Sequence, residues 1–270
     1  MKKYVLLFVV LIIIISGLYA QLDTVVSMIK KSYMIPMRDG VKLYTVVLSP
    51  VNYPKPIPIL IQRTPSGAYS PVKDDSALMV SLLPLFYRNM AKEGYILVFQ
   101  DIRGKFRSEG AFEMCRPLYH LTDKTKTDES TDAWDTVDWL IKNIPHNNGK
   151  AGVLGISYPG FYATMAAASN HPALVAVSPQ APVTNWFIGD DFHHNGALFL
   201  MDAFSFYSPL GRGFGLPRPR PTTKGPVSVG FPVHDNYRFY LETGTLTSFK
   251  KLTGDSVRFW NDLYAHPDYD

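Results

Sequence analysis

One stretch of the chain has the residue types and spacing of a nucleophilic serine. Residues 151–161, AGVLGISYPGF, read as an apolar strand, a tight turn with Ser157 at its tip and an alanine-rich helix. Such a turn presents the serine beside a helix N-terminus, where N–H groups favour a developing oxyanion. Gly155 lets the strand pass beneath the turn, and Pro159 suits a first helical turn. The alternative is a strand-to-helix turn whose serine has no catalytic role, because Pro159 interrupts the plain G-x-S-x-G pattern.

The elements around this stretch predict the sheet that would position it. Apolar strands are expected at 56–61, 95–100, 151–154 and 174–178, alternating with helices at 77–93 and 131–142. Such alternation predicts a mostly parallel sheet with helices on both faces. An Asp-Gly turn at 39–40, between strands at 32–36 and 41–49, adds an antiparallel hairpin at one edge. With a serine turn in its middle, this α/β arrangement is that of the α/β-hydrolase fold.

The alternation of strands and helices stops after residue 182. Residues 208–232 are dense in glycine and proline, and helices return at 236–241 and 256–264. We therefore predict that residues 21–182 form the N-terminal part of a hydrolase domain, and that 183–270 begin a helical cap inserted into it. On this interpretation the hydrolase domain is incomplete in the 270 residues.

Residues 1–20 have the order of a secretion signal. Lys2 and Lys3 precede an apolar run at 4–15 that is short for a membrane span, and small residues lead to Ala20. We predict cleavage there and export to the periplasm or the outside of a bacterial cell, with no stable membrane association afterwards. A retained anchor is the alternative, since Leu18 is large for its position near the cut.

Charge and composition exclude several kinds of partner. The formal charge of +4 falls to +2 without Lys2 and Lys3, which is too small to indicate nucleic acid. His193 and His194 are adjacent rather than one helical turn apart, so no metal and no other cofactor is predicted. Cys115 is the only cysteine, which rules out an internal disulfide. The sequence is also compatible with an oligomer of identical chains.

Six stretches in order along the chain resemble those of one family. They are RDGV at 38–41, RTP at 63–65, QDIRG at 100–104 followed by SEG, WDTVDWL at 134–140, GISYPG at 155–160 and GDDFHHNGA at 189–197. Together they resemble the X-Pro dipeptidyl-peptidase and cocaine esterase group of serine hydrolases, and within it the α-amino acid ester hydrolases most. The resemblance covers roughly residues 30–270.

This resemblance implies roles for particular residues. Ser157 takes the place of the nucleophile, and the backbone N–H of Tyr158 that of one oxyanion donor. Asp191 takes the place of a carboxylate that binds the α-ammonium group of the substrate, with Asp190 and His193 as further candidates beside it. The implied substrate is a small ester or amide, or a peptide, that bears an α-amino group. Without the resemblance, an N-cap or a solvated acidic pair would be the preferred interpretation of the two aspartates.

The chain departs from the family pattern at two places. Ser66 stands where the family has a tyrosine that donates to the oxyanion, and we hypothesise that Tyr69 replaces it. None of the seven histidines lies where the base of the triad is expected, so we expect the triad Asp and His beyond residue 270. The alternatives are therefore an X-Pro dipeptidyl peptidase, a general carboxylesterase, or a truncated chain that binds ligands without catalysis.

Overall fold

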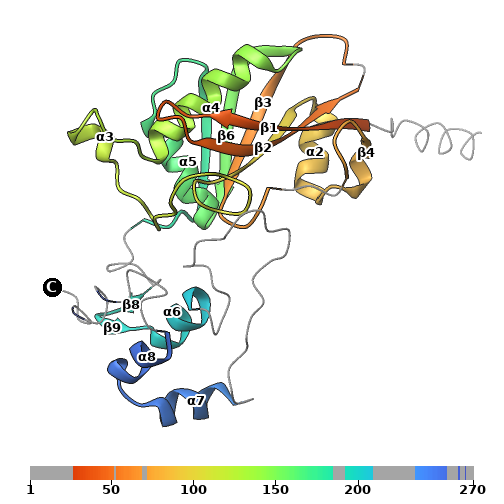
Figure 1. Cartoon of the computed structure of the whole chain (residues 1–270). Helices are drawn as coiled ribbons and strands as arrows, with labels where there is room; N and C mark the ends of the chain where they lie inside the picture. Colours follow the sequence, from red (N-terminus) through yellow and green to blue (C-terminus); the bar gives the residue numbers. More distant parts are fainter. Residues whose placement is uncertain are drawn as a thin grey trace, which may run out of the picture.

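Seven strands form one sheet in the computed structural model of the chain, in the order β4-β1-β2-β5-β3-β6-β7 (Figure 1). The structure describes residues 27–51, 53–68, 72–184, 192–208, 235–253, 261 and 265. The strands are β1 (Ser27–Pro36), β2 (Lys42–Pro50), β3 (Ile57–Thr64), β4 (Ala77–Met79), β5 (Ile96–Asp101), β6 (Asn147–Ile156) and β7 (Leu174–Gln180). β5, β3, β6 and β7 are parallel, while β4, β1 and β2 pair antiparallel. The predicted parallel sheet with an antiparallel edge is confirmed.

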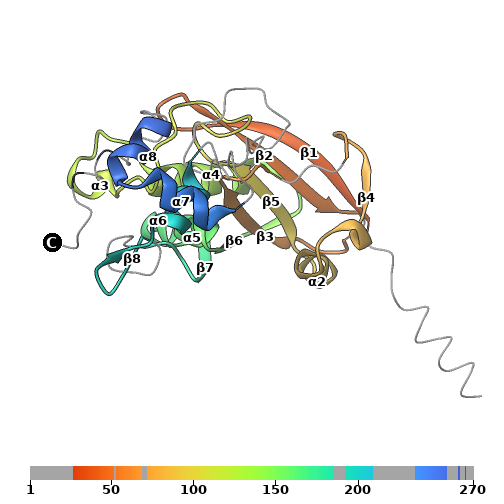
Figure 2. The same cartoon turned by 90° about the horizontal axis from the view of Figure 1, so that it is seen from below.

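Helices cover the two faces of this sheet, because alternate strand residues point to opposite sides. The elements are η1 (Val80–Leu82), α2 (Leu85–Glu93), α3 (Tyr119–Thr122), α4 (Glu129–Asn143) and α5 (Tyr158–Ala168). α4 and α5 lie side by side over an apolar cluster that includes Val47, Val98 and Val153 (Figures 1 and 2). η1 and α2 contribute to a second cluster that includes Leu48 and Leu97. The two clusters form the core.

The helix predicted over 77–93 is wrong in its first half. β4 occupies its start and pairs with β1, and α2 begins only after Pro84. A proline disfavours helical backbone in the residue before it, and Leu83 is extended, with φ −75° and ψ 151°. The end was predicted correctly, since Gly94 caps α2 with φ 90°. A Cβ there would lie 2.2 Å from the Tyr53 hydroxyl.

α4 begins at a capping box. The Asp128 carboxylate accepts the N–H groups of Ser130 and Thr131 at 2.9 and 3.0 Å, and the Thr131 hydroxyl accepts the Asp128 N–H at 2.8 Å. The helix predicted over 131–142 is thus confirmed and starts two residues earlier. Its first turn is buried and carries Glu129 and Asp132, two carboxylates that become important at the site.

The C-terminal elements are grouped apart from the sheet (Figure 1). They are β8 (His193–His194), β9 (Ala197–Leu198), α6 (Leu200–Tyr207), α7 (Asn236–Thr243) and α8 (Leu246–Thr253). Phe204, Phe239 and Phe249 pack ring against ring, with centroids 5.0–6.2 Å apart. α7 confirms the helix predicted at 236–241. Nearly all of 208–232 and 256–264 lies outside the described residues, and the domain boundaries stay a prediction.

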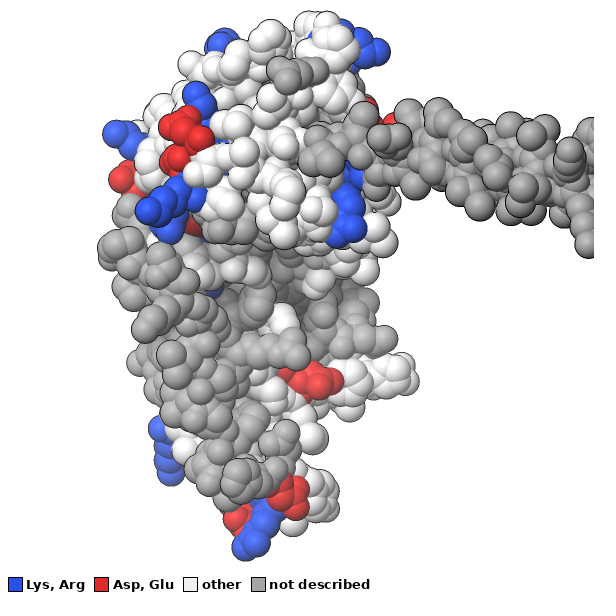
Figure 3. All heavy atoms as spheres, turned by 90° about the vertical axis from the view of Figure 1, so that its right-hand side faces the viewer, with Lys and Arg blue, Asp and Glu red and all other residues white. Residues whose placement is uncertain are grey.

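None of the helices that the structure describes is both long and apolar enough to cross a bilayer. The signal-like residues 1–20 lie outside the described part of the chain. On the face that Figure 3 shows, the described surface is mostly uncharged, with small separate groups of basic and acidic side chains. The described part of this face therefore shows no extended surface of one charge.

β7 leaves apolar side chains in contact with solvent. It is the last strand of the sheet on its side, and Val175 and Val177 are 61% and 37% exposed. On the α2 face, a groove of about 280 Å³ runs between α2 and the strands β6 and β7. An exposed apolar edge strand is a site for pairing with another chain. We therefore expect this edge to drive self-association.

We predict that Val175→Lys shifts the chain from aggregates toward monomer, because a charge on an edge strand opposes pairing. Light scattering after size-exclusion chromatography measures this. Leu121→Lys is the matched control, since Leu121 is 63% exposed and lies on α3, away from β7. A wild-type chain that is monomeric at high concentration, or an equal effect of both variants, would contradict the expectation.

Candidate active site

Ser157 lies in a strained turn between β6 and α5. Its φ of 62° and ψ of −121° are rare for a residue with a side chain and are typical of functional sites. The residue is exposed, and its side chain forms no cap hydrogen bond with α5. The hydroxyl is therefore available to a substrate rather than used to stabilise the helix.

Two glycines allow this turn, because α5 passes very close to the end of β6. A Cβ at Gly155 would lie 2.1 Å from the Pro159 carbonyl oxygen, and one at Gly160 would lie 2.8 Å from the Gln180 carbonyl oxygen. The Ser157 N–H donates to the Gln180 carbonyl at 2.9 Å, which ties the turn to the end of β7. The glycines and proline of the sequence pattern are thus explained by contacts.

Tyr158 anchors the turn from beneath. Its side chain is buried, and its hydroxyl accepts the Cys115 N–H at 2.8 Å. Its ring lies 5.4 Å from that of Tyr162, centroid to centroid. Burial raises the pKa of Tyr158 well above its usual 10, so the phenol stays neutral. The backbone N–H of Tyr158 belongs to the first turn of α5, at the helix end whose dipole favours an oxyanion.

Further residues lie near Ser157 because the parallel strands β5, β3 and β6 all end on this side of the sheet. Ile61 pairs with Val153, so the end of β3 at Thr64 lies beside the end of β6, just before Ser157. Adjacent strands are about 4.8 Å apart. The loop at 65–68 therefore begins next to the serine. Ser66 is exposed in this loop, whereas Tyr69 lies outside the described residues.

Asp101 ends β5 opposite Thr64 and carries a buried carboxylate. One oxygen accepts the N–H of Ala68 and the other that of Arg107, at 3.2 Å. Burial raises the pKa of Asp101 to about 6, and the two N–H groups and the Arg107 charge oppose that rise. The carboxylate is thus ionised at neutral pH, and both its oxygens accept a hydrogen bond.

Five charged side chains form a buried ionic cluster below the site. Arg63 lies 3.1 Å from Glu129, Arg103 lies 2.6 Å from Asp132, and Arg116 lies 2.7 Å from Glu129. All five are less than 10% exposed. The cluster joins the end of β3, the segment after β5 and the first turn of α4. Sequence reasoning missed it, although two of its arginines fall in the RTP and QDIRG stretches.

The ionic cluster also contacts α5. The Arg63 guanidinium lies 5.5 Å from the centre of the Tyr162 ring and donates to Gln100 at 2.9 Å. Tyr162 is buried on the helix that starts at the serine turn. The charges that fix β3 and α4 therefore also support the helix behind Ser157.

The structure does not bring all the predicted residues together. Asp190 and Asp191 lie outside the described residues. His193 is buried in β8, within the two-stranded sheet that β8 forms with β9. Among the described residues, no histidine hydrogen-bonds to the hydroxyl of Ser157, and no group of three or more His, Cys, Asp or Glu side chains could hold a metal ion.

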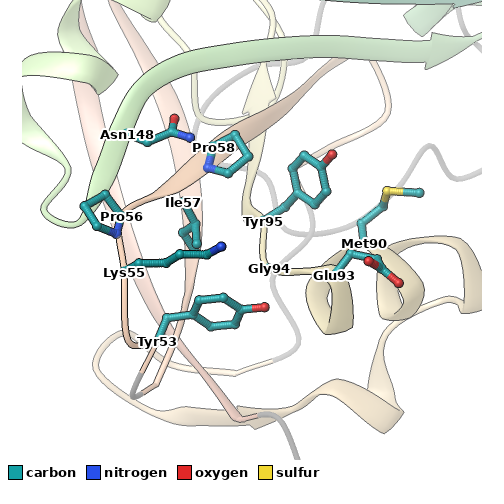
Figure 4. A pocket seen from close by; sticks show the side chains of 10 residues that line it. All are labelled: Tyr53, Lys55, Pro56, Ile57, Pro58, Met90, Glu93, Gly94, Tyr95 and Asn148. Carbon is teal, nitrogen blue, oxygen red and sulfur yellow. The ribbon is translucent and has the colours of Figure 1, made fainter.

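A cavity of about 520 Å³ lies at the amino ends of the parallel strands, opposite to the end that carries Ser157 (Figure 4). Ile57 at the start of β3, Tyr95 just before β5 and Asn148 near the start of β6 line it. Since Ser157 follows the end of β6, this cavity is not part of the candidate site despite its volume.

We predict that the stability of wild type relative to Asp101→Asn rises as the pH falls from 7 to 4. The unfolded pKa of 3.8 is raised to about 6 on folding, so the folded chain binds the proton more tightly between these values. The gain is up to about 3 kcal/mol, at 1.36 kcal/mol per pKa unit. Urea unfolding at several pH values measures it.

Asp123→Asn is the matched control for this experiment. Asp123 is an exposed carboxylate whose pKa is lowered by hydrogen bonds from Thr125. Because the pKa of Asp123 is lowered on folding, its contribution to stability changes with pH in the opposite direction. This contribution is lost only as the pH falls below about 4. A constant difference between wild type and Asp101→Asn across this range would contradict the pKa assignment.

Comparison with known proteins shows which family the chain resembles. The model of the X-Pro dipeptidyl-peptidase (S15) family matches residues 39–225. The cocaine esterase of Rhodococcus sp. (strain MB1 Bresler) is 28% identical over 185 residues, which are 68% of this chain and 29% of that protein.

Two solved structures are similar over 90% of this chain. An α-amino acid ester hydrolase is 38% identical with a TM-score of 0.76, and an aminopeptidase from a marine sediment archaeon, Thaumarchaeota archaeon, is 35% identical with a TM-score of 0.75. The chain spans only 38% of each of these structures. The chain thus has the α/β-hydrolase fold and belongs to the X-Pro dipeptidyl-peptidase (S15) family of esterase and peptidase hydrolases.

Proposed function

We propose that the chain carries the nucleophile of a serine acyl hydrolase. The observation that supports this most is the exposed Ser157 in its strained turn at the start of α5. The Ser157 oxygen attacks the carbonyl carbon of an ester or amide, and its proton passes to a general base. The Tyr158 N–H stabilises the resulting oxyanion. The alcohol or amine leaves with that proton, and water then attacks the acyl-enzyme to release the acid.

The general base is the part of this mechanism that we assign outside the described residues. Serine is a weak nucleophile without a base, and no described histidine bonds to the Ser157 hydroxyl. The oxyanion donor and substrate binding alone give residual catalysis, about 10³–10⁴-fold over water in other serine hydrolases. The chain therefore supplies the nucleophile and one oxyanion donor, and its turnover depends on the base.

We infer that the substrates carry an α-amino group next to the reacting carbonyl. The similar structures include an α-amino acid ester hydrolase and an aminopeptidase, whose names both denote such substrates. Asp191 supplies the charge that a desolvated ammonium group needs, because hydrogen bonds between charged groups are the stronger kind. A dipeptidyl peptidase specific for X-Pro would also bind a free α-amino group, but one residue further from the reacting carbonyl, whereas an esterase that resembles the cocaine esterase would not need one.

A second candidate function is ligand binding without catalysis. One observation favours it: among the described residues, no histidine hydrogen-bonds to the Ser157 hydroxyl. On this reading Ser157 keeps its strained turn, but esters bind without turnover.

Hydrolysis of two matched esters distinguishes these functions. We expect wild type, in a chain that includes the general base, to cleave phenylalanine methyl ester faster than methyl 3-phenylpropanoate, which lacks only the amino group. Asp191→Asn should lower this preference by about 10- to 100-fold, since a hydrogen bond to a charged group is worth about 1.5–3 kcal/mol. The measurement is kcat/KM for both esters by acid release.

Two controls accompany this measurement. Asp190→Asn removes the neighbouring carboxylate and should reduce the preference less than Asp191→Asn. Ser157→Ala should abolish turnover of both esters. Equal rates for the two esters would contradict the amino-acyl assignment, and no turnover of either by wild type would favour the binding function.

A further inference from the structure

The segment that follows β5 holds the loop at 65–68 through two contacts. The Asp101 carboxylate accepts the N–H of Ala68. The Phe106 ring packs on the adjacent Gly67, where a Cβ would lie 3.5 Å from the ring atoms. These contacts join residues that are more than 30 positions apart in the chain. The loop is thus fixed by a second segment, independently of its own sequence.

Asp101 is itself held in a fixed orientation. Its carbonyl oxygen accepts the hydroxyl of Ser108 at 2.6 Å, and the Ser108 oxygen accepts the Tyr44 N–H at 2.8 Å. The next residue, Ile102, donates its N–H to the Thr64 carbonyl at 3.2 Å. The backbone on both sides of the carboxylate is thus held in place, and the carboxylate oxygens accept the N–H groups of Ala68 and Arg107.

Two acceptor oxygens are needed at this position. One oxygen serves the Ala68 N–H and the other the Arg107 N–H, so a single acceptor would leave one of these two groups unpaired. The turn from Asp101 to Arg107 is tight, since Gly104 within it has φ 72° and a Cβ there would lie 2.1 Å from the Phe112 nitrogen. In this closely packed turn each of the two N–H groups has its own acceptor oxygen.

The loop held in this way borders the serine. β3 lies between β5 and β6, so the loop that leaves β3 has Asp101 on one flank and Ser157 on the other. α5 rises from Ser157 itself, and the end of β7 lies beyond it. An acyl oxygen at Ser157 thus has the Tyr158 N–H on one side and this loop on the other.

We propose that Asp101 is a positioning residue for hydrolysis at Ser157. Its carboxylate does not touch the substrate; it fixes the loop at 65–68 where that loop borders the reacting carbonyl. The role rests on the proposed function of the chain as a serine acyl hydrolase. A misplacement of about 1 Å in an active site can lower a rate about 100-fold, so loss of this contact should affect kcat strongly.

The test combines amide exchange with ester hydrolysis in Asp101→Asn. Residue-specific hydrogen exchange by NMR should show at least tenfold faster exchange at Ala68 or Arg107, while the amide of Ile61 within β3 keeps its wild-type rate. For phenylalanine methyl ester, kcat should fall by about tenfold or more with KM within about twofold, since positioning acts on the transition state. Asp101→Glu keeps two acceptor oxygens and should retain more of kcat, and it replaces Asp101→Asn if that variant does not fold.

Asp123→Asn is again the control, because Asp123 also accepts a backbone N–H, that of Thr125, in a different turn. It should leave the exchange of Ala68 and kcat unchanged. Unchanged exchange at both Ala68 and Arg107 in Asp101→Asn would overturn the proposal. So would unchanged kcat in an active enzyme whose loop exchange is faster. If wild type cleaves neither ester, the hydrolase function itself fails, and the catalytic role of Asp101 fails with it.

Discussion

The close approach of α5 to the end of β6 is the constraint on which the site depends. At this distance the chain turns with Ser157 at a positive φ of 62°, a strained conformation that costs on the order of 1–3 kcal/mol. Glycine is required at 155 and 160, because a Cβ at either would collide with backbone atoms. Burial of Phe161 and Tyr162 on α5 offsets the cost by holding the helix on the sheet. A strained serine on a buried helix is both exposed and fixed in place.

The buried ionic cluster controls where that helix lies. Buried ion pairs contribute little net stability compared with apolar packing, yet removal of one partner costs about 3–5 kcal/mol because a charge is left uncompensated. The cluster therefore acts mainly by making one arrangement of β3, α4 and the segment after β5 far better than others. Through Arg63 and Tyr162 this arrangement extends to α5. Asp101 adds the same kind of link for the loop beside the serine.

Local signals in the sequence were sufficient for the serine turn and for most of the sheet. Gly155, Pro159 and Gly160 act on their near neighbours, so their spacing alone predicts the turn. The helix over 77–93 failed because β4 is defined by pairing with β1, as Met28 pairs with Leu78, and apolar periodicity does not reveal such distant partners. The ionic cluster joins residues 13 to 69 positions apart and appears only in the folded chain.

Phosphonylation of Ser157 tests the central claim most directly. The folded chain, the chain unfolded in urea and Ser157→Ala are each treated with a fluorophosphonate, and the modified peptide is quantified by mass spectrometry. The account predicts that the probe adds to Ser157 in the folded wild type and in neither of the other two samples. Equal modification of the folded and unfolded chains would show that the fold around Ser157 does not make this serine reactive, and would contradict the account.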